Sequence, residues 1–509
     1  MRHHSATAFV AAAPAPSAAA YTAAGSEARP SLRPASTELK GIVRLLTCGS
    51  VDDGKSTLIG RLLWDASPLY DDQRAKLLKE SGSLHGIQRP DFSRLLDGLI
   101  AEQQQGITID VAWHYFDTEH RRIVLIDSPG HEQYTRNMAT GASNADVAVL
   151  LVDAQSGVKR QTRRHLAILD LAGVRKVVLA VNKMDLIGWS EERFRAIVED
   201  FTASAAQFPS LAWIAIPVSA LNGDNIAKRS EFMPWYSGPT FVEHLETVNA
   251  REDNLDEPFR MPVQMVLRDG EGFRGVAGTV TAGKIALGDE VFDALSGKSS
   301  RIRQISTMDG PLKSARSGQS VVIELADHID VGRGSLLTTK EGALSSSRAL
   351  NVRIVWLSND AYSPKRGYLL RTAADLVPVV ALTIEGDLDL DTLELKAADS
   401  CEPNGIAEAR IDLARPIAAD LFSGHARTGA FMIVDAVTGA AVAGGIVNGI
   451  SADAAANEKA AFTLTGEMLR GLCADLKPNG EDEAEFRRRA NEVAIILRAA
   501  GVAVELAAA

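Results

Sequence analysis

Short apolar runs alternate with helix-like stretches between residues 40 and 245. The runs that we expect to form buried strands span residues 43–48, 122–126, 176–181 and 215–218. Near-continuous apolar runs of this length are typical of parallel strands that helices cover on both faces. Residues 111–116 are expected to add an antiparallel edge strand. The pattern predicts an α/β domain over residues 40–250 with a mostly parallel, doubly wound sheet.

The spacing of the apolar runs changes after a polar linker at residues 253–258, which a proline closes. Short β-rich runs, among them residues 261–268, 275–281 and 321–324, are separated by glycine turns about every ten residues, a pattern typical of an antiparallel barrel. A second set covers residues 351–357, 430–434 and 441–447. The sequence therefore predicts two successive antiparallel β-barrels, at residues 258–346 and 350–450.

The two ends of the chain differ from this pattern. Residues 1–39 are rich in alanine and proline and are expected to form a disordered leader, in which Pro14 and Pro16 interrupt any secretory signal. Residues 451–509 are expected to form a short α/β tail, with a helix at 481–500 and a strand at 501–506. No run approaches the roughly 18 apolar residues of a membrane-spanning helix, so we expect no association with a membrane.

Composition narrows the class of protein. At 509 residues the chain is too long for one hydrophobic core. Its formal net charge of −11 argues against a protein whose main task is to bind nucleic acid. The cysteines, Cys48, Cys401 and Cys473, lie far apart, which predicts neither a disulfide framework nor a zinc site. These features favour a cytoplasmic protein.

Candidate chemistry begins at the carboxyl end of the first predicted strand. A complete G-x-x-x-x-G-K-S loop follows that strand, and Thr57 then begins a helix; the loop residues are Gly49, Ser50, Val51, Asp52, Asp53, Gly54, Lys55 and Ser56. Backbone N–H groups of such a loop surround phosphate oxygens, its lysine reaches the terminal phosphates, and its serine hydroxyl binds Mg²⁺. The loop predicts a nucleoside triphosphate site.

Three further motifs follow the other strands. They consist of Asp127 and Gly130 after the second strand, Asn182, Lys183 and Asp185 after the third, and Ser219, Ala220 and Leu221 after the fourth. Asp127 can hold the hydration shell of Mg²⁺, and the Gly130 N–H can meet the γ-phosphate. Asp185 can accept hydrogen bonds from two donors that guanine presents and adenine does not. All four motifs in this order predict a GTP-binding domain.

A second match to G-x-x-x-x-G-K occurs at residues 278–284. It is followed by Ile285, which has no hydroxyl for Mg²⁺, and it lies between predicted strands rather than before a helix. We therefore expect a hairpin there and no second nucleotide site.

Two loops indicate the kind of GTPase. Thr108 lies in Gly-Ile-Thr-Ile at residues 106–109, and His131 directly follows Gly130. Gly-Ile-Thr-Ile together with Asp-x-Pro-Gly-His resembles the translation-factor superfamily of GTPases. Within that superfamily, residues 49–63, 131–143 and 233–239 resemble the large, GTP-hydrolysing subunit of bacterial sulfate adenylyltransferase. The resemblance covers residues 40–450.

The resemblance implies a role for each candidate residue. Lys55 and the backbone of residues 52–56 would hold the β- and γ-phosphates of GTP. Ser56 and Thr108 would ligate Mg²⁺, and Asp127 would bind it through water. His131 would position the attacking water. Val51 and Ile107 match the apolar pair that keeps this histidine away until a partner triggers hydrolysis.

The family resemblance also implies an activity and a partner. GTP hydrolysis in this family drives the synthesis of adenylylsulfate from ATP and sulfate, the first step of sulfate assimilation toward cysteine. The chain has neither the Ser-Gly-Gly-x-Asp-Ser motif of ATP pyrophosphatases nor an H-x-G-H motif. ATP and sulfate are therefore expected on a small, ATP pyrophosphatase-like catalytic subunit, in a heterodimer or a larger heteromer. A separate adenylylsulfate kinase is a further expected partner.

The alternative is a GTPase like the translation elongation factors, which would deliver a tRNA to the ribosome. The net charge, residues 233–239 and the tail favour the sulfate adenylyltransferase hypothesis. In the tail, residues 465–476, 487–488 and 491–493 resemble an internal piece of adenylylsulfate kinase. No phosphate loop precedes this piece, and Thr465 and Glu467 stand where that kinase carries two aspartates. We expect an inactive kinase remnant, with an unrelated helical tail as the alternative.

Overall fold

The computed structural model of the chain describes residues 41–66, 83–84, 87–88, 92, 108, 110–118, 120–249, 255–269, 272–342, 344, 346–450, 462–464, 485, 488–489, 491–493 and 504–506. Its first large sheet has six strands in the order β4-β5-β1-β6-β7-β8. These are β1 (Ile42–Gly49), β4 (Ala112–Asp117), β5 (Arg122–Asp127), β6 (Val147–Asp153), β7 (Lys176–Asn182) and β8 (Ala212–Pro217). All pair in parallel except β4, which lies antiparallel to β5 at the edge. The predicted α/β sheet and its antiparallel edge strand are confirmed.

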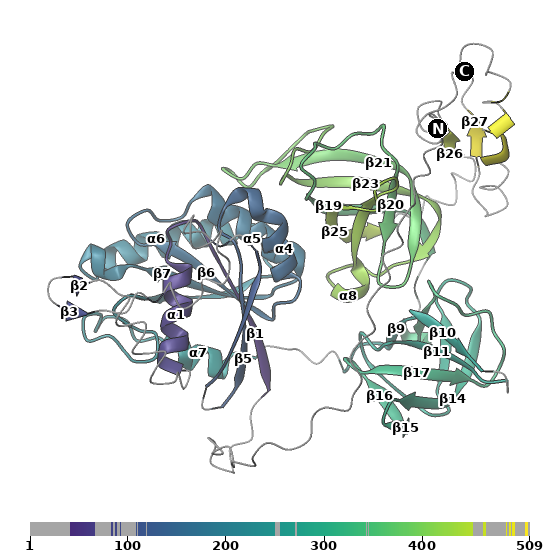
Figure 1. Ribbon diagram of the computed structural model, residues 1–509, viewed down its shortest axis with the longest axis horizontal. Helices are drawn as coiled ribbons and strands as arrows, with labels where there is room; N and C mark the ends of the chain where they lie inside the picture. The colour runs from purple at the N-terminus through teal and green to yellow at the C-terminus, as the bar shows by residue number, and fades with distance from the viewer. Residues whose placement is uncertain are drawn as a thin grey trace, which may run out of the picture. The chain divides into compact units, whose positions relative to one another are not determined.

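Helices cover both faces of this sheet (Figure 1). One face packs against α4 (Thr135–Ala142), α5 (Arg160–Ala172) and α6 (Glu191–Ala205). The other face packs against α1 (Lys55–Ala66) and α7 (Phe241–Thr247). The central strand β6 is buried along its whole length. Its sequence has no polar alternation because both faces of a parallel strand are covered. This strand is not among the four buried strands expected from the sequence.

Parallel pairing brings the carboxyl ends of the strands to one edge of the sheet. Thr47 of β1 lies opposite Asp127 of β5, and Asp153 of β6 lies opposite Asn182 of β7. The loops that follow β1, β5, β7 and β8 carry the four predicted motifs. Ligands of doubly wound sheets bind at this edge, outside the carboxyl ends of the strands.

The second large sheet closes into a barrel. Its order is β10-β11-β17-β14-β13-β18-β9, and only Val263 and Gln264 separate β9 (Arg260–Pro262) from β10 (Met265–Arg268). The other strands are β11 (Arg274–Thr279), β13 (Glu290–Asp293), β14 (Ser299–Thr307), β17 (Ser320–Leu325) and β18 (Leu336–Thr338). Residues 260–268 pair with β18 at one end and with β11 at the other, which closes the ring. The β-rich run expected at 261–268 therefore contains two strands.

The expected hairpin at residues 278–284 is wrong. Strand β11 ends inside this segment, and β12 (Lys284–Ala286) begins at its last residue. The described partner of β12 is β16 (Ser314–Arg316), whereas β11 pairs with β10 and β17. Gly283 has φ +68°, and a Cβ there would lie 2.5 Å from the carbonyl oxygen of Glu257. The glycine thus permits a close backbone approach at a connection between two sheets.

The third large sheet is also a closed barrel. It has the order β20-β24-β25-β19-β23-β21-β22, and β20 also pairs with β21; the short strand β22 is Leu395–Lys396. Its strands are β19 (Ser346–Trp356), β20 (Tyr368–Arg371), β21 (Leu376–Leu388), β23 (Ile406–Ala418), β24 (Ala430–Asp435) and β25 (Ala441–Ile450). Trp356 is buried in its core and packs edge-on against Tyr362 and Tyr368. The two antiparallel barrels expected from the sequence are confirmed as a fold class.

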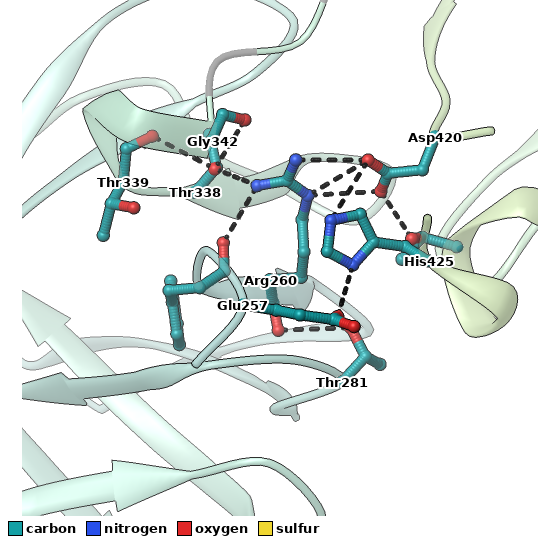
Figure 2. Close-up of polar contacts among 10 residues, drawn as sticks. Glu257, Arg260, Thr281, Thr338, Thr339, Gly342, Asp420 and His425 are labelled. Carbon is teal, nitrogen blue, oxygen red and sulfur yellow. Dashed lines mark hydrogen bonds and ion pairs between the residues drawn. The ribbon is translucent and has the colours of Figure 1, made fainter. Parts of the chain in front are cut away.

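A buried ion pair joins residues of the two barrels. Figure 2 shows the guanidinium of Arg260, on β9, facing the carboxylate of Asp420, which follows β23. The Arg260 Nη2 lies 3.1 Å from the Asp420 Oδ1, and both side chains are 4% exposed. The Thr428 hydroxyl donates to the same carboxylate, and the His425 Nδ1 lies 2.9 Å from the Glu257 Oε2. Because both charges of the Arg260–Asp420 pair are buried, losing either one would leave the other uncompensated.

Few residues of the chain ends are described. In the tail, β26 (Phe462–Leu464) pairs in parallel with β27 (Val504–Leu506), so the carboxyl end of the strand expected at 501–506 is present. The leader at 1–39 and most of the segments that resemble adenylylsulfate kinase lie outside the described residues. The boundaries at 250, 258, 346, 350 and 450 stay predictions. Among the described residues, no helix has the length and apolar character needed to cross a membrane.

Candidate nucleotide-binding site

The phosphate-binding loop connects the end of β1 to the start of α1. Its backbone has positive φ at Gly49, Asp52 and Gly54. A Cβ on Gly54 would lie 2.4 Å from the Asn182 Nδ2. Glycine is therefore required at position 54 by a close contact as well as by its backbone conformation. The loop is held against the motif that follows β7.

Lys55 is the first residue of α1 and is folded back onto this loop. Its Nζ donates to the carbonyl oxygens of Gly49 and Ser50, each at 2.9 Å, and the residue is 7% exposed. Burial lowers the pKa of Lys55, while the carboxylates of Asp127 and Asp53 oppose that shift. A buried ammonium at this place is positioned for the anionic end of a nucleotide.

The carboxylate of Asp127 accepts hydrogen bonds from two hydroxyl groups. The Thr47 Oγ1 donates to its Oδ1 at 3.1 Å, and the Thr108 Oγ1 to its Oδ2 at 3.4 Å. Ser56, one residue after Lys55, lies at the start of α1. In the described part of the chain there is no cluster of three or more His, Cys, Asp or Glu residues suited to a metal ion. Hydroxyls with one carboxylate suit Mg²⁺, which keeps much of its coordination for water and substrate phosphates.

Asn182 connects three of the motifs. Its Nδ2 donates to the carbonyl oxygen of Asp53 at 2.9 Å, and its Oδ1 accepts from the N–H of Ala220 at 3.0 Å. The residue is 2% exposed. Both ends of its amide are therefore hydrogen-bonded, one to the backbone of the phosphate loop and the other to that of the Ser219–Ala220–Leu221 loop, and the side chain fixes the distance between them.

Asp185 lies in the short 3₁₀ helix η3 (Met184–Ile187) and is half-buried. The Ser219 hydroxyl donates to its Oδ1 at 2.7 Å, which orients the carboxylate. Lys183 has φ +62°, and its Nζ lies 2.8 Å from the Asp153 Oδ2. Leu221 is 45% exposed, and its carbonyl oxygen accepts from Arg61 of α1 at 3.3 Å. The loop after β7 is thus held by a side chain of β6, and the loop after β8 by a side chain of α1.

His131 caps the 3₁₀ helix η2 (Glu132–Tyr134) at the amino end. Its Nδ1 accepts from the N–H of Gln133 at 3.3 Å, and the side chain is exposed. Gly130 packs directly against the phosphate loop, since a Cβ there would lie 2.3 Å from the Lys55 Nζ and 2.5 Å from the Gly49 carbonyl oxygen. Val51 is half-buried in the loop. Its predicted apolar counterpart, Ile107, lies outside the described residues.

Comparison with known proteins shows the family to which the chain belongs. Residues 40–268 match the family described as the elongation factor Tu GTP binding domain, and residues 349–448 match the GTP-eEF1A C-terminal domain-like family. Sulfate adenylyltransferase subunit 1 of Methylorubrum extorquens is 43% identical over 444 residues, which are 86% of this chain and 94% of that protein. The chain belongs to the sulfate adenylyltransferase subunit 1 family. This family lies within the translation-factor superfamily of GTPases, as the sequence predicts.

Two further relatives agree with this placement. Subunit 1 of Teredinibacter turnerae is 43% identical over 83% of this chain and 90% of its own length. The bifunctional enzyme NodQ of a Rhizobium species is 46% identical over 81% of this chain. The chain spans only 64% of the length of NodQ. The family and its GTP-binding domain follow from these matches.

Some residues that contact the site are not among the candidates expected from the sequence. Thr47 lies near the carboxyl end of β1 and donates to Asp127, and Asp153 ends β6 and pairs with Lys183. The signal for both is a polar residue near the carboxyl end of an apolar run. The Asp53–Lys159 pair joins positions 106 residues apart, and no motif contains Lys159. Cys48, next to the loop, is fully buried, and burial raises the pKa of its thiol to about 12, so it is a packing residue.

Replacing Gly130 with alanine is expected to weaken GTP binding about tenfold or more, because the new methyl group would push the Gly49 carbonyl out of the phosphate loop. Titration of a fluorescent GTP analogue measures the effect. Gly332→Ala is the matched control, since a Cβ there meets open space. Equal GTP affinity in Gly130→Ala and in the control would contradict the close packing of Gly130 on the loop.

Proposed function

We propose that this chain binds GTP with Mg²⁺ and hydrolyses it to drive the formation of adenylylsulfate from ATP and sulfate on a separate catalytic subunit. Membership of the sulfate adenylyltransferase subunit 1 family supports the reaction. The match to a GTP-binding domain supports GTP hydrolysis as the source of free energy for this reaction. The sequence has neither the Ser-Gly-Gly-x-Asp-Ser motif nor the H-x-G-H motif that would handle ATP and sulfate.

The observation that carries the proposal is the way Asn182 and Ser219 position Asp185. Asn182 spans from the phosphate loop to Ala220, so the base-reading loops stand at a fixed distance from the phosphate site. The Ser219 hydroxyl donates to one oxygen of Asp185. A carboxylate fixed in this way accepts from two adjacent N–H donors, which guanine offers and adenine does not. This geometry supports GTP rather than ATP as the nucleotide.

The phosphates would be held by the loop that contains Lys55. The backbone N–H groups of residues 52–56 would donate to the β- and γ-phosphates, and the Lys55 ammonium would exchange its carbonyl acceptors for phosphate oxygens. The hydroxyls of Ser56 and Thr108 would ligate Mg²⁺, with Asp127 behind its water ligands. The ion would supply charge neutralisation between the β- and γ-phosphates when it is bound.

Hydrolysis would depend on orientation more than on a strong base. Phosphoryl transfer has a loose transition state, so placing the water in line matters more than removing its proton. His131 would place that water, and the close packing of Gly130 on the loop fixes where its backbone begins. In this structure the imidazole faces outward and caps η2. Val51 and Ile107 would separate it from the γ-phosphate until the partner acts.

The partner would be a small catalytic subunit of the ATP pyrophosphatase type, in a heterodimer or larger heteromer, with an adenylylsulfate kinase as a further partner. The name subunit 1 of the relatives refers to an assembly with more than one kind of chain. Delivery of a tRNA is the competing function. No specific contact of the described site favours it.

Affinity purification of the tagged chain from native extract tests the proposed partner. We expect an ATP pyrophosphatase-like chain to co-purify in a fixed ratio and to be identified by peptide mass spectrometry. The Lys55→Ala variant serves as a control for whether the association needs bound nucleotide. Recovery of ribosomal proteins or tRNA in place of such a chain would refute the proposal and favour the translation-factor alternative.

A further inference from the structure

The phosphate loop contains a buried acidic side chain. Asp53 belongs to the loop itself and is 1% exposed. Its Oδ2 accepts from the N–H of Ser50 at 2.7 Å, so the carboxylate ties the loop to itself. Its carbonyl oxygen accepts from Asn182. A loop that must attract a polyphosphate therefore contains a carboxylate whose field opposes that attraction.

Lys159 provides the opposite charge. Its Nζ lies 2.8 Å from the Asp53 Oδ1, and its side chain is 35% exposed. The residue caps α5 at the amino end, where its backbone N–H donates to the Thr162 hydroxyl at 3.1 Å. The backbone of Lys159 is thus anchored, and the side chain reaches across from α5 to the phosphate loop.

The Lys159–Asp53 pair affects the balance of charge around the phosphate loop. Lys55 faces the carboxylates of Asp127 and Asp53, both almost fully buried. Without Lys159, the carboxylates of Asp127 and Asp53 would outnumber the Lys55 ammonium at the place where phosphates bind. The second nearby pair is Lys183 with Asp153, whose Nζ and Oδ2 atoms lie 2.8 Å apart. The Lys159 charge also acts on Asp153, but the carboxylate with which Lys159 forms its ion pair is that of Asp53.

We propose that Lys159 determines the affinity of the site for the polyphosphate of the nucleotide, by neutralising the buried carboxylate of Asp53. The proposal rests on the proposed binding of GTP and adds a residue that no nucleotide-binding motif contains. Lys159 acts through Asp53 and is a positioning and charge-balancing residue rather than a catalytic one. Because the effect is electrostatic, it must grow with the charge of the ligand.

Equilibrium titration of four variants with GTP, GDP and uncharged guanosine tests this inference. Lys159→Met is expected to weaken GTP binding about tenfold or more, GDP binding less, and guanosine binding not at all. Adding Asp53→Asn to Lys159→Met removes both charges while keeping an acceptor for the Ser50 N–H, and it is expected to restore GTP affinity to within a few-fold of the unmodified chain. Lys159→Arg is expected to retain it.

Arg160→Met is the matched control. It removes the same charge from the adjacent residue, which is 60% exposed and lies 3.7 Å from Asp391 rather than from the loop. We expect it to leave all three affinities unchanged. An equal loss for guanosine and GTP in Lys159→Met, or no recovery in the double variant, would overturn the inference. An unmodified chain that binds no guanine nucleotide would instead refute the proposed function itself.

Discussion

Replacing Asp185 with asparagine is expected to lower GTP affinity by several kcal/mol, roughly a thousandfold. In the proposed site the carboxylate would accept two hydrogen bonds from guanine, whereas asparagine would present an N–H group to one of these donors. The same change replaces a poor contact with xanthine by a favourable one, since xanthine carries a carbonyl where guanine carries its amino group. Competition of GTP, ATP and xanthosine triphosphate against a fluorescent GTP analogue measures all three affinities.

The matched control for Asp185→Asn is Asp200→Asn, on α6. Asp200 lies 3.5 Å from Arg163, has a side chain that is 47% exposed, and is not part of a nucleotide-binding motif. We expect this variant to bind GTP as the unmodified chain does. If Asp185→Asn kept its preference for GTP over ATP and xanthosine triphosphate, Asp185 would not read the base.

Replacing His131 with alanine is expected to lower partner-stimulated GTP hydrolysis by about two orders of magnitude or more, the scale of losing a group that positions water. GTP affinity is expected to stay within about twofold, because the imidazole is exposed at the cap of η2 and does not contact the phosphate loop through any described hydrogen bond. Single-turnover hydrolysis with saturating partner subunit separates the two effects.

His120→Ala, in the turn between β4 and β5, provides the control for His131→Ala. It removes the same side chain from the same domain away from the four motifs. Near-normal stimulated turnover in His131→Ala would mean that another group orients the water. A parallel fall of GTP affinity and turnover would point to a structural role for the histidine.

The parts of the fold that follow a local pattern could be predicted from the sequence. Strands β1, β5, β7 and β8 lie where their apolar runs are, and each ends at its motif, because burial on both faces selects a continuous run. The central strand β6 has an equally apolar run and was missed because no motif follows it directly. The connection at 278–284 was misjudged, since its glycine serves a contact with Glu257 that lies far along the chain.

The candidate site also has parts that follow from a local pattern and parts that depend on contacts between distant residues. Asp127, Asn182 and Asp185 are brought together by parallel pairing, which the order of the strands already implies. The Lys159–Asp53 and Arg260–Asp420 pairs depend on which distant side chains meet, over 106 and 160 residues. Nothing local in the sequence marks such partners. The roles assigned to His131, Val51 and Ile107 rest on the family resemblance and stay proposals.

The most direct test of the account measures adenylylsulfate formed from ATP and radioactive sulfate by the chain together with its co-purified catalytic subunit. The account predicts that GTP accelerates this synthesis, that a non-hydrolysable GTP analogue does not, and that Lys55→Ala abolishes the acceleration while leaving the complex assembled. Synthesis at the same rate without GTP, with the analogue, or with Lys55→Ala would contradict the coupling of GTP hydrolysis in this chain to adenylylsulfate formation.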